Sequence, residues 1–536
     1  MRGIVTIDAG TTSIRAILFD ERGAVLAAEQ RTNPPTFFPD GRVEQEASTW
    51  KGALVRILSA CAEAARGAGV EILGLALASQ RSSVIPVDER GEALHPAIMW
   101  QDQRTEPICR ELGERQSYVY RKTGLRISPV FSAVKMTWLR RNRPEVFGRT
   151  HKMLGIHDYL VFHLTGGFVT DRSLASRTNL FDLASGEWDP GLLELFEVER
   201  SRLCSLVDQG EVAGALTPSM ARATGLREGL PLVSAGGDQQ CAALGMGLLA
   251  PGQLVANTGT GSYVIGLSDR PVFDGLMRLS CNVAATPGNY IVEAGILSSG
   301  ALYAWFKEKF YDASGAEAGF AAINEEASAA PPGAHGVLLL PHFKGAGSPH
   351  WNPNAKGLFF GLSLGTSRGD MARALLEGIA AEMAQNVSLI EALTGAAREV
   401  RVSGGLSNLP LYNQIQADLY GRRVLRSGDG EATARGAWIS AAVRLGLYDS
   451  HAAAFAAAEA ATRAAQATAA APRAAPPRAD APSAEPNPGA PSSGKSGAGD
   501  RAYLPNPETA AVYAALRERA ARLYTALDAA GIYGLP

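Results

Sequence analysis

The sequence predicts an α/β protein with two similar domains, and three observations lead to this fold class. The chain has 536 residues and 46% hydrophobic content, which can fill two cores and is too long for one compact domain. Strand-like and helix-like segments alternate along its first part, as in α/β domains. A hairpin rich in Gly and Thr at residues 4–20 recurs at residues 252–269. One such hairpin at the head of each half predicts two related domains that face each other across a ligand.

The first hairpin has the composition of an anion-binding turn. Two β-branched, mostly apolar runs, residues 4–7 and 14–19, flank the turn as strands that enter a sheet. Gly10 lets the backbone bend or approach a ligand, and Arg15 adds a positive charge. Asp8 ends the first strand, where a carboxylate suits a hydrated Mg²⁺ ion. Hydroxyl groups and amides for the anion come from Thr11, Thr12 and Ser13. The alternative is an ordinary turn, which favours the same residues.

The second hairpin repeats this plan around Gly259 and Thr260. An apolar strand, a loop of Thr, Gly and Ser, a second apolar strand and an Asp follow in the same order as in the first hairpin. A phosphate-binding turn in each half predicts a nucleotide held between the two domains.

Charge and cysteine content exclude several classes of partner. The formal net charge is −2 and the basic residues are spread out, so we expect neither a nucleic-acid nor a membrane partner. The first strand begins at about residue 3, and no apolar run approaches the ~20 residues of a membrane span. The five cysteines have no metal-ligand spacing and predict reduced thiols in a cytoplasmic protein. They are Cys61, Cys109, Cys204, Cys241 and Cys281.

Polar residues follow two predicted strands of the first half. The buried strand at residues 72–78 runs into Gln80 and Arg81, and the apolar residues 97–99 run into Trp100 and Asp102. Open α/β sheets place ligand contacts at such carboxyl ends. Surface charges or a core aromatic residue would explain the same residues without a ligand.

Asp238 lies where a third strand ends. The apolar residues 230–235 break at two glycines, and Asp238 and Gln239 then begin a predicted helix. Asp at this place is also a common helix N-cap, worth about 1 kcal/mol. Further on, residues 370–393 have apolar residues at helical spacing and precede a short strand at residues 400–402.

Taken in order, these motifs are those of a known enzyme family. The chain resembles the FGGY family of carbohydrate kinases, and within it glycerol kinase and xylulokinase members most. The resemblance covers roughly residues 3–450 and about the last 35 residues. The matching motifs are Asp8 to Ser13, Gln80-Arg81, Trp100-Gln101-Asp102, Gly237 to Gln240, Gly259-Thr260-Gly261, Gly357 to Leu362 and Ser403-Gly404-Gly405.

The resemblance implies two actin-like ATPase (ribonuclease H-like) domains that flank a nucleotide cleft. ATP and Mg²⁺ would lie in the cleft, and the γ-phosphate would pass to a hydroxyl of a small sugar or polyol. Asp238 would be the catalytic base, and Asp8 and Asp238 would lie at the metal. The substrate would contact Gln80, Arg81, Trp100, Asp102, Asp238 and Gln239. ATP would contact Thr11, Thr12, Ser13, Arg15, Gly259, Thr260, Gly404, Gly405 and Asn408. Whether two copies of the chain form a homodimer stays open.

Two positions depart from the family pattern. Val130 stands where glycerol kinases carry a Tyr, and Ser82 stands where they carry a Glu. Xylulokinases have a Met-His-Gly sequence where this chain has Gln80-Arg81-Ser82. The loss of two hydrogen-bonding groups predicts either a loosely held small polyol or room for a larger one.

Composition divides the chain into four parts. We expect an N-terminal domain at residues 1–245, a C-terminal domain at residues 246–451, and a helix at residues 501–536 that completes the kinase fold. Residues 452–500 turn abruptly to Ala, Pro, Ser and Gly and predict a disordered insertion, with a helix as the alternative for its Ala-rich start.

Two other functions stay open at this point. An actin-like ATPase could couple its nucleotide state to binding a protein, and a family member could phosphorylate a non-sugar signalling molecule. The set of Arg81, Trp100 and Asp238 favours the carbohydrate kinase, since a protein-binding ATPase does not require it.

Overall fold

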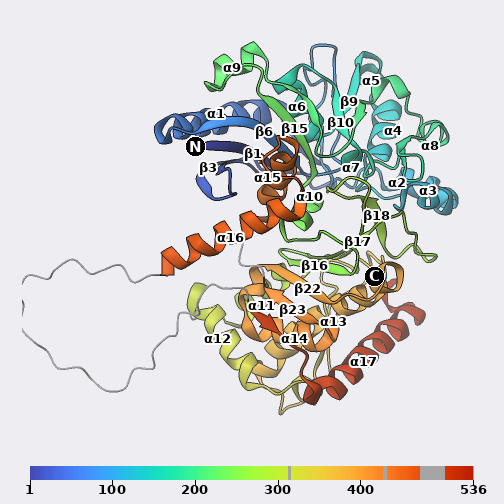
Figure 1. Cartoon of the computed structure of the whole chain (residues 1–536). Coiled ribbons are helices and arrows are strands. Elements are labelled where there is room, and N and C mark those ends of the chain that lie inside the picture. The colour runs from blue at the N-terminus through green and yellow to red at the C-terminus, as the bar shows by residue number, and fades with distance from the viewer. Residues whose placement is uncertain (312–315, 427–430, 471–500, 535–536) are drawn as a thin grey trace, which may run out of the picture.

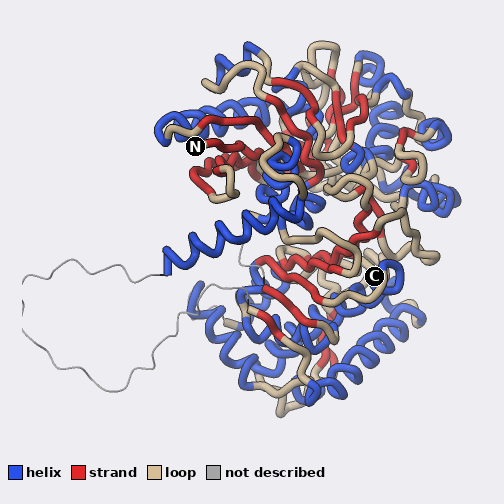
Figure 2. The backbone as a smooth tube through the Cα atoms, in the orientation of Figure 1, coloured by secondary structure: helices blue, strands red, loops and turns tan. Residues whose placement is uncertain are grey.

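A computed structural model describes residues 1–311, 316–426, 431–470 and 501–534, which form two α/β lobes (Figure 1). Each lobe is built on one large sheet with helices packed against it (Figure 2). This confirms the predicted fold class.

The first sheet has the strand order β14-β15-β6-β1-β2-β3. The β1–β2 hairpin is antiparallel, whereas β6 runs parallel to both β1 and β15. Helix α1 (Ala47–Ala68) packs Trp50, Leu54 and Ile57 into the core on one face. The strands are β1 (Arg2–Ala9), β2 (Ser13–Asp20), β3 (Val25–Thr32), β6 (Glu71–Ser79), β14 (Val212–Ala215) and β15 (Pro231–Gly237).

The second sheet repeats this plan, in the order β18-β19-β17-β16-β22-β23-β24. The β16–β17 hairpin is again antiparallel, and β22 is parallel to both β16 and β23. The repeat predicted from the two hairpins is therefore confirmed. The strands are β16 (Gln253–Thr258), β17 (Ser262–Ser268), β18 (Ser280–Val283), β19 (Tyr290–Ile296), β22 (Glu399–Gly404), β23 (Arg423–Arg426) and β24 (Ala502–Tyr503).

Two helices cross between the lobes, α10 (Asp238–Gly245) and α15 (Ala432–Arg444). A Cβ on Gly245 would lie 1.9 Å from the Ala432 carbonyl oxygen, and one on Gly436 would lie 1.9 Å from that of Cys241. Only glycine allows this backbone contact. Helix α15 comes from the second half of the chain but buries Trp438 against the first sheet. The two lobes thus share a packed centre.

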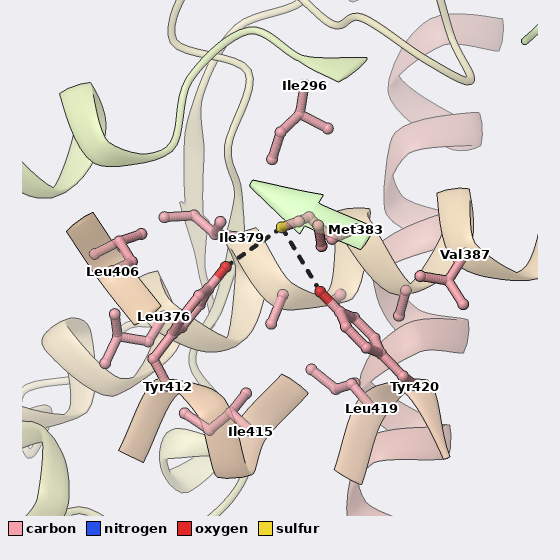
Figure 3. Close-up of a cluster of buried hydrophobic side chains, with 14 of the residues drawn as sticks. Ile296, Leu376, Ile379, Met383, Val387, Leu406, Tyr412, Ile415, Leu419 and Tyr420 are labelled. Atoms are coloured by element: carbon pink, nitrogen blue, oxygen red, sulfur yellow. Dashed lines mark hydrogen bonds between the residues drawn. The ribbon is translucent and has the colours of Figure 1, made fainter. Parts of the chain in front are cut away.

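The core of the second lobe is centred on the long helix α13 (Arg368–Thr394), which confirms the helix predicted at residues 370–393. Its start is a capping box, because Ser367 and Asp370 each accept a hydrogen bond from the other's backbone N–H. The Met383 sulfur accepts hydrogen bonds from the hydroxyls of Tyr412 and Tyr420 (Figure 3). Helices α14 (Pro410–Tyr420) and α17 (Ala510–Ala529) pack beside it.

The remaining elements are shorter, and most of them belong to the first lobe. The helices are α2 (Glu106–Glu111), α3 (Gln116–Thr123), α4 (Ser132–Asn142), α5 (Pro144–Arg149), α6 (Ile156–Thr165), α7 (Arg172–Ala175), α8 (Pro190–Leu195), α9 (Pro218–Thr224), α11 (Gly300–Phe310) and α12 (Ala316–Ala329). The strands are β4 (Thr36–Phe37), β5 (Val43–Gln45), β7 (Ile85–Val87), β8 (Ala97–Ile98), β9 (Lys152–Leu154), β10 (Val169–Asp171), β11 (Phe181–Asp182), β12 (Glu187–Trp188), β13 (Ser205–Val207), β20 (Leu338–Leu340) and β21 (Leu358–Phe360).

The start of the predicted insertion is helical, which confirms the helix named as the alternative there and corrects the expectation of disorder for residues 452–470. Helix α16 (His451–Ala470) buries Ala454, Phe455 and Ala458 in the cluster that contains Trp438. These apolar contacts stabilise the Ala-rich segment as a helix. The rest of the predicted insertion, residues 471–500, lies outside the described residues. After it, Tyr503 of β24 pairs with Val424 at the edge of the second sheet.

The five cysteines are all buried and unpaired, as predicted. Among the described residues, we find no helix whose length and apolar character would suit a membrane span.

Candidate active site

A cavity of about 200 Å³ lies between the two sheets and is lined by both lobes. Most residues predicted to bind the substrate gather there, together with one from the first hairpin. They are Thr11, Gln80, Arg81, Trp100, Asp238 and Gln239. The second lobe contributes Tyr263 and Glu293 from its sheet, and Ser348 and Trp351 from the loop after β20. A bound ligand would therefore contact both halves of the chain.

Asp238 is the first residue of α10, and Gly237 is the helix N-cap. The alternative interpretation of Asp238 as the N-cap is therefore wrong. The strand before it, β15, ends at Gly237, and its Gly236 has a φ of +116° and a position where a Cβ would lie 2.6 Å from the Ser173 hydroxyl oxygen. This glycine turn places the Asp238 carboxylate at the cavity.

The Asp238 carboxylate is held from two sides. Its Oδ1 accepts a hydrogen bond of 2.7 Å from the Gln239 backbone N–H and lies 3.4 Å from Arg81 Nε. Burial raises the pKa of Asp238 above its ordinary value, although the positive charge of Arg81 opposes this. A carboxylate with a raised pKa in a cavity is suited to accept a proton.

Arg81 links the two lobes inside the cavity. Its guanidinium donates to both carboxylate oxygens of Glu293 in β19, over 3.0 and 3.3 Å. It also donates to the side chain of Gln240 over 3.2 Å. Burial alone would raise the pKa of Glu293, but the charges of Arg81 and Arg177 hold it below its ordinary value. Glu293 is therefore a charged partner that fixes the orientation of Arg81.

Trp100 connects the cavity to the first hairpin. Its indole N–H donates to the Thr11 hydroxyl over 3.0 Å, and its backbone N–H donates to the Ser83 hydroxyl over 3.2 Å. The residue predicted to hold the substrate thus touches the turn predicted to bind phosphate.

Gln80 presents a free donor to a ligand. Its side-chain oxygen accepts from the Ser83 hydroxyl over 3.1 Å, while its buried Nε2 has no hydrogen-bond partner among the described residues. A buried unpaired amide is costly unless a ligand or water satisfies it. Ser82, in contrast, uses its hydroxyl to donate to the Arg177 carbonyl over 3.1 Å.

Asp102 does not line this cavity, which corrects its prediction as a substrate contact. Its side chain is fully buried and accepts hydrogen bonds from the Val43 backbone N–H over 2.6 Å and from Arg104 Nε over 2.8 Å. Arg104 in turn pairs with Glu44 over 2.7 Å. The carboxylate therefore fastens the segment after β8 to β5.

Asp8 and Arg15 lie behind the first turn. Arg15 is 3.5 Å from Asp8 and 2.8 Å from Glu431, which precedes α15. Burial, opposed by Arg15 and reinforced by the charge of Asp238, raises the pKa of Asp8 to about 6. The charge of Asp238 thus disfavours the charged form of Asp8, and a divalent cation bound to both carboxylates would remove this repulsion. Asp8 and Asp238 are thus compatible with Mg²⁺.

The ATP contacts predicted in the second half share one edge of its sheet. Thr258 and Gly404 are paired in register, so Gly259 and Thr260 follow one strand while Gly405 and Asn408 follow its neighbour. Gly404 has φ of +90°, and a Cβ there would lie 2.3 Å from the Thr258 carbonyl oxygen. All five predicted contacts are exposed, and none of them lines the cavity described above. They are Gly259, Thr260, Gly404, Gly405 and Asn408. Asn408 accepts a hydrogen bond of 2.5 Å from Arg426.

Thr12 and Ser13 lie at the tip and the far side of the first turn. The Thr12 carbonyl accepts from the Asn33 backbone N–H over 2.7 Å, and Ser13 begins β2. Neither lines the cavity, so only Thr11 of this turn reaches it.

Several lining residues were missed from the sequence, namely Arg126, Arg177, Tyr263, Ser280, Glu293 and Trp351. Glu293 carried a signal, because it is a lone acidic residue within the apolar run of β19. Tyr263 lies just beyond the second turn, where its alternation along β17 could have placed it on the cavity side.

Comparisons with known proteins agree with this geometry. Residues 3–245 match the FGGY family of carbohydrate kinases, N-terminal domain, and residues 254–445 match the C-terminal domain of that family. A glycerol kinase of Alkalilimnicola ehrlichii is 35% identical over 474 residues, covering 85% of this chain and 93% of the relative. A glycerol kinase of Geobacter sp. (strain M21) is 36% identical over 476 residues, covering 85% and 92%.

Solved structures share the fold over most of the chain. Xylulose kinase from Rhodospirillum rubrum superposes with a TM-score of 0.87 and 26% identity, covering 100% of both chains. Plasmodium falciparum glycerol kinase with ADP gives a TM-score of 0.79 at 24% identity, covering 86% of this chain and 92% of that one.

Proposed function

Since the chain belongs to the FGGY family of carbohydrate kinases and is an ATP-dependent sugar kinase, we propose that it phosphorylates a small sugar or polyol bound between the lobes. The observation that carries this proposal is the convergence of Arg81, Trp100, Asp238 and Gln239 on one cavity lined by both sheets. The substrate would be glycerol-like or xylulose-like.

Asp238 acts as the general base in this proposal. One of its carboxylate oxygens takes the proton from the substrate hydroxyl, and the substrate's hydroxyl oxygen forms a bond to the γ-phosphorus. The bond from the γ-phosphorus to the β–γ bridging oxygen breaks, and ADP leaves with its electron pair. Phosphoryl transfer needs little covalent help, so the carboxylate mainly orients the hydroxyl. The raised pKa of Asp238 supports proton acceptance by this carboxylate.

The other cavity residues position the substrate. Arg81 is fixed by Glu293 and can donate to a substrate oxygen beside Asp238. The free Nε2 of Gln80 offers a second donor, and Gln239 offers an amide side chain at the same wall. The Trp100 ring supplies an apolar surface for the carbon skeleton.

The nucleotide would lie across the two turns. We assign ATP contacts to Thr11, Thr12, Ser13 and Arg15 in the first lobe, and to Gly259, Thr260, Gly404, Gly405 and Asn408 in the second. Asp8 and Asp238 would hold Mg²⁺, which neutralises phosphate charge when it is bound. Exposed glycines at the end of β22 support close approach of the nucleotide to the backbone.

Side chains at two positions favour a substrate larger than glycerol. Val130 lines the cavity without a hydrogen-bonding group, and the Ser82 hydroxyl is already bonded to the Arg177 carbonyl. A small polyol would leave this side of the cavity unfilled.

The proposed domain division follows the two sheets, with residues 1–245 and 246–451 as the lobes and residues 501–536 completing the second. Buried, unpaired cysteines support a reducing compartment such as the cytoplasm.

The experiment is ADP release by the purified chain with MgATP and a panel of polyols and ketoses. At least one member should raise ADP release well above the substrate-free rate, and the product should gain one phosphate by mass. A silent panel with ATP bound would contradict the proposal and favour a protein-binding ATPase or a non-sugar acceptor.

A further inference from the structure

Two histidines of the loop at residues 341–357 do not line the cavity between the lobes. The loop follows β20 and presents Ser348 and Trp351 to the cavity between the lobes. His342 and His350 instead meet Glu382 of α13. The loop is therefore held between the substrate cavity and the core helix of the second lobe.

The three side chains have the spacing of a metal site. His342 Nε2 lies 3.2 Å and His350 Nε2 lies 3.8 Å from the same Glu382 Oε1, and ligand atoms of all three residues lie within 4.8 Å of one another. A tetrahedral ion with bonds of about 2.1 Å places its ligand atoms about 3.4 Å apart. Small side-chain movements would suffice to reach this geometry.

The surroundings of the cluster also favour a cation. His342 and Glu382 are 3% and 8% exposed, and Glu382 has no Lys or Arg partner among the described residues. His342 Nδ1 is buried without a hydrogen-bond partner in this part of the chain. A buried carboxylate without a charged partner is unfavourable unless it gains a proton or a cation.

The cluster also offers a place for a fourth ligand. His350 and Glu382 border a cavity of about 260 Å³ between α13 and α17, large enough for a water molecule at the ion. The ring of Tyr524 from α17 stacks on His350 with 3.6 Å between ring centroids. This stacking fixes the imidazole and connects the terminal helix to the cluster.

We propose that His342, His350 and Glu382 bind a divalent transition-metal ion such as Zn²⁺. Two imidazoles and one carboxylate with an open fourth position are a ligand set that this ion accepts. The ion fastens the loop at residues 341–357 to α13 and thereby fixes the wall of the substrate cavity that carries Trp351. Its role is structural.

The test compares zinc binding by untagged full-length chains after removal of metal with a chelator. The wild type should bind one Zn²⁺ per chain, and the ion should raise its melting temperature, whereas Mg²⁺ should not. Glu382→Gln and His350→Gln should each weaken Zn²⁺ binding by about 100-fold or more, because removal of even an outer-shell partner costs 10–100-fold. His335→Gln is the matched control, since His335 pairs with Asp370 over 2.7 Å outside this cluster.

Wild-type binding no tighter than that of the two variants would overturn the proposal and leave a hydrogen-bonded His–Glu–His cluster. Metal-free melting temperatures of all four chains show whether a variant merely fails to fold. A variant that folds and still binds one Zn²⁺ with wild-type affinity would equally contradict the assignment.

A second observation concerns Arg126, which lines the cavity between the lobes without an acidic partner. Among the described residues its guanidinium has no ion pair or hydrogen bond, and it lies 5.7 Å from the ring centroid of Trp351. The two other arginines of the cavity, Arg81 and Arg177, both lie within 4 Å of Glu293. Arg126 thus brings to the cavity wall a positive charge that pairs with neither carboxylate of the lining.

The lining contains three arginines and two carboxylates, Asp238 and Glu293, so it has one positive charge in excess. Burial lowers the pKa of Arg126, opposed by its interactions with Tyr120 and Asp274, and neither of these two residues lines the cavity. The pKa of an arginine lies far above neutral pH, so Arg126 stays charged and favours an anionic group of a ligand.

We infer that the substrate carries an anionic group, a carboxylate or a phosphate, that pairs with Arg126. This inference rests on the proposed function, because it concerns the acceptor of the same reaction. The hydroxyl that is phosphorylated would lie at Asp238, and the anionic group would lie at the wall formed by Arg126 and Trp351.

The test measures kcat/KM for a neutral pentitol, the matching aldonic acid and the matching pentitol phosphate. The wild type should prefer one anionic substrate over the neutral one by about tenfold or more, since a charge-assisted hydrogen bond contributes about 1.5–3 kcal/mol. Arg126→Gln should remove this preference, whereas Arg121→Gln, at an exposed position on α3, should keep it.

The two ways of failing are distinguishable. Equal kcat/KM for the neutral and both anionic substrates would overturn the inference and leave the kinase intact. Absence of ADP release with all three, and with the wider panel, would instead count against the proposed function.

Discussion

The guanidinium group of Arg81 donates two hydrogen bonds, of 3.0 and 3.3 Å, to the carboxylate of Glu293 on the opposite lobe. Arg81 follows β6 of the first sheet, and Glu293 lies within β19 of the second. Arg81 Nε also lies 3.4 Å from Asp238. One ion pair thus places the second lobe in contact with the proposed base.

Glu293→Gln should lower kcat/KM for the sugar or polyol by about 10- to 100-fold, because a charge-assisted pair is worth about 1.5–3 kcal/mol. The variant leaves Arg81 without its charged partner, so its guanidinium can turn toward Asp238. Steady-state kinetics check this. Glu308→Gln, at an exposed glutamate on α11, is the control and should match the wild type. A Glu293→Gln enzyme with wild-type kinetics would show that Arg81 needs no partner.

The acidic limb of the pH profile should lie near pH 6. The pKa of Asp8 is raised to about 6 by burial, and that of Asp238 is raised for the same reason. Both groups act as carboxylates, so kcat/KM should be full above these pKa values and fall as the pH drops through them. An unshifted Asp, with a pKa of about 3.9, would place the limb about two units lower. A flat profile between pH 5 and 7 would contradict the raised pKa values.

Asp102→Asn should destabilise the protein while sparing the chemistry. The Asp102 carboxylate is fully buried and bound to Arg104 and the Val43 N–H, so its loss breaks a buried ion pair at a cost of about 3–5 kcal/mol. Denaturant unfolding should show this loss. The number of active sites is counted by ATP binding, and the kcat per active site should stay within a few-fold of the wild type. A fall in kcat as large as that of an Asp238 variant would instead indicate that Asp102 contacts the substrate.

Deletion of residues 474–499 should leave turnover and melting temperature nearly unchanged. The segment consists mostly of Ala, Pro, Ser and Gly and has little apolar surface to bury, so it contributes little to the folded state. Residues 451–470 stay in this variant, because α16 buries Phe455. Melting curves and ADP release of the shortened chain check this, and a loss of several degrees would show that the segment packs or joins an interface.

The sequence allowed the repeated elements to be predicted, and it was weaker on partners that meet from distant parts of the chain. The two hairpins, the strand before Gln80 and the helix at residues 370–393 follow from local periodicity and turn residues. Glu293 lies 212 residues beyond Arg81, and only the facing of the two sheets brings them together.

Asp102 shows the converse problem. It follows a strand end, as a ligand contact would, yet its side chain turns inward to Arg104. The Ala-rich start of the predicted insertion is similar, since α16 packs Ala454, Phe455 and Ala458 into the cluster that contains Trp438. In both cases the deciding interaction is tertiary and leaves no local pattern.

The most direct measurement is the turnover of Asp238→Asn beside its affinity for ATP. Asn keeps the size of the side chain but accepts no proton, so kcat should fall by about 10² to 10⁴ while ATP binds as in the wild type. Asp449→Asn, at an exposed position after α15, is the control and should leave both quantities unchanged. Near wild-type turnover of Asp238→Asn would contradict its role as the base and, with it, the proposed arrangement of the active site.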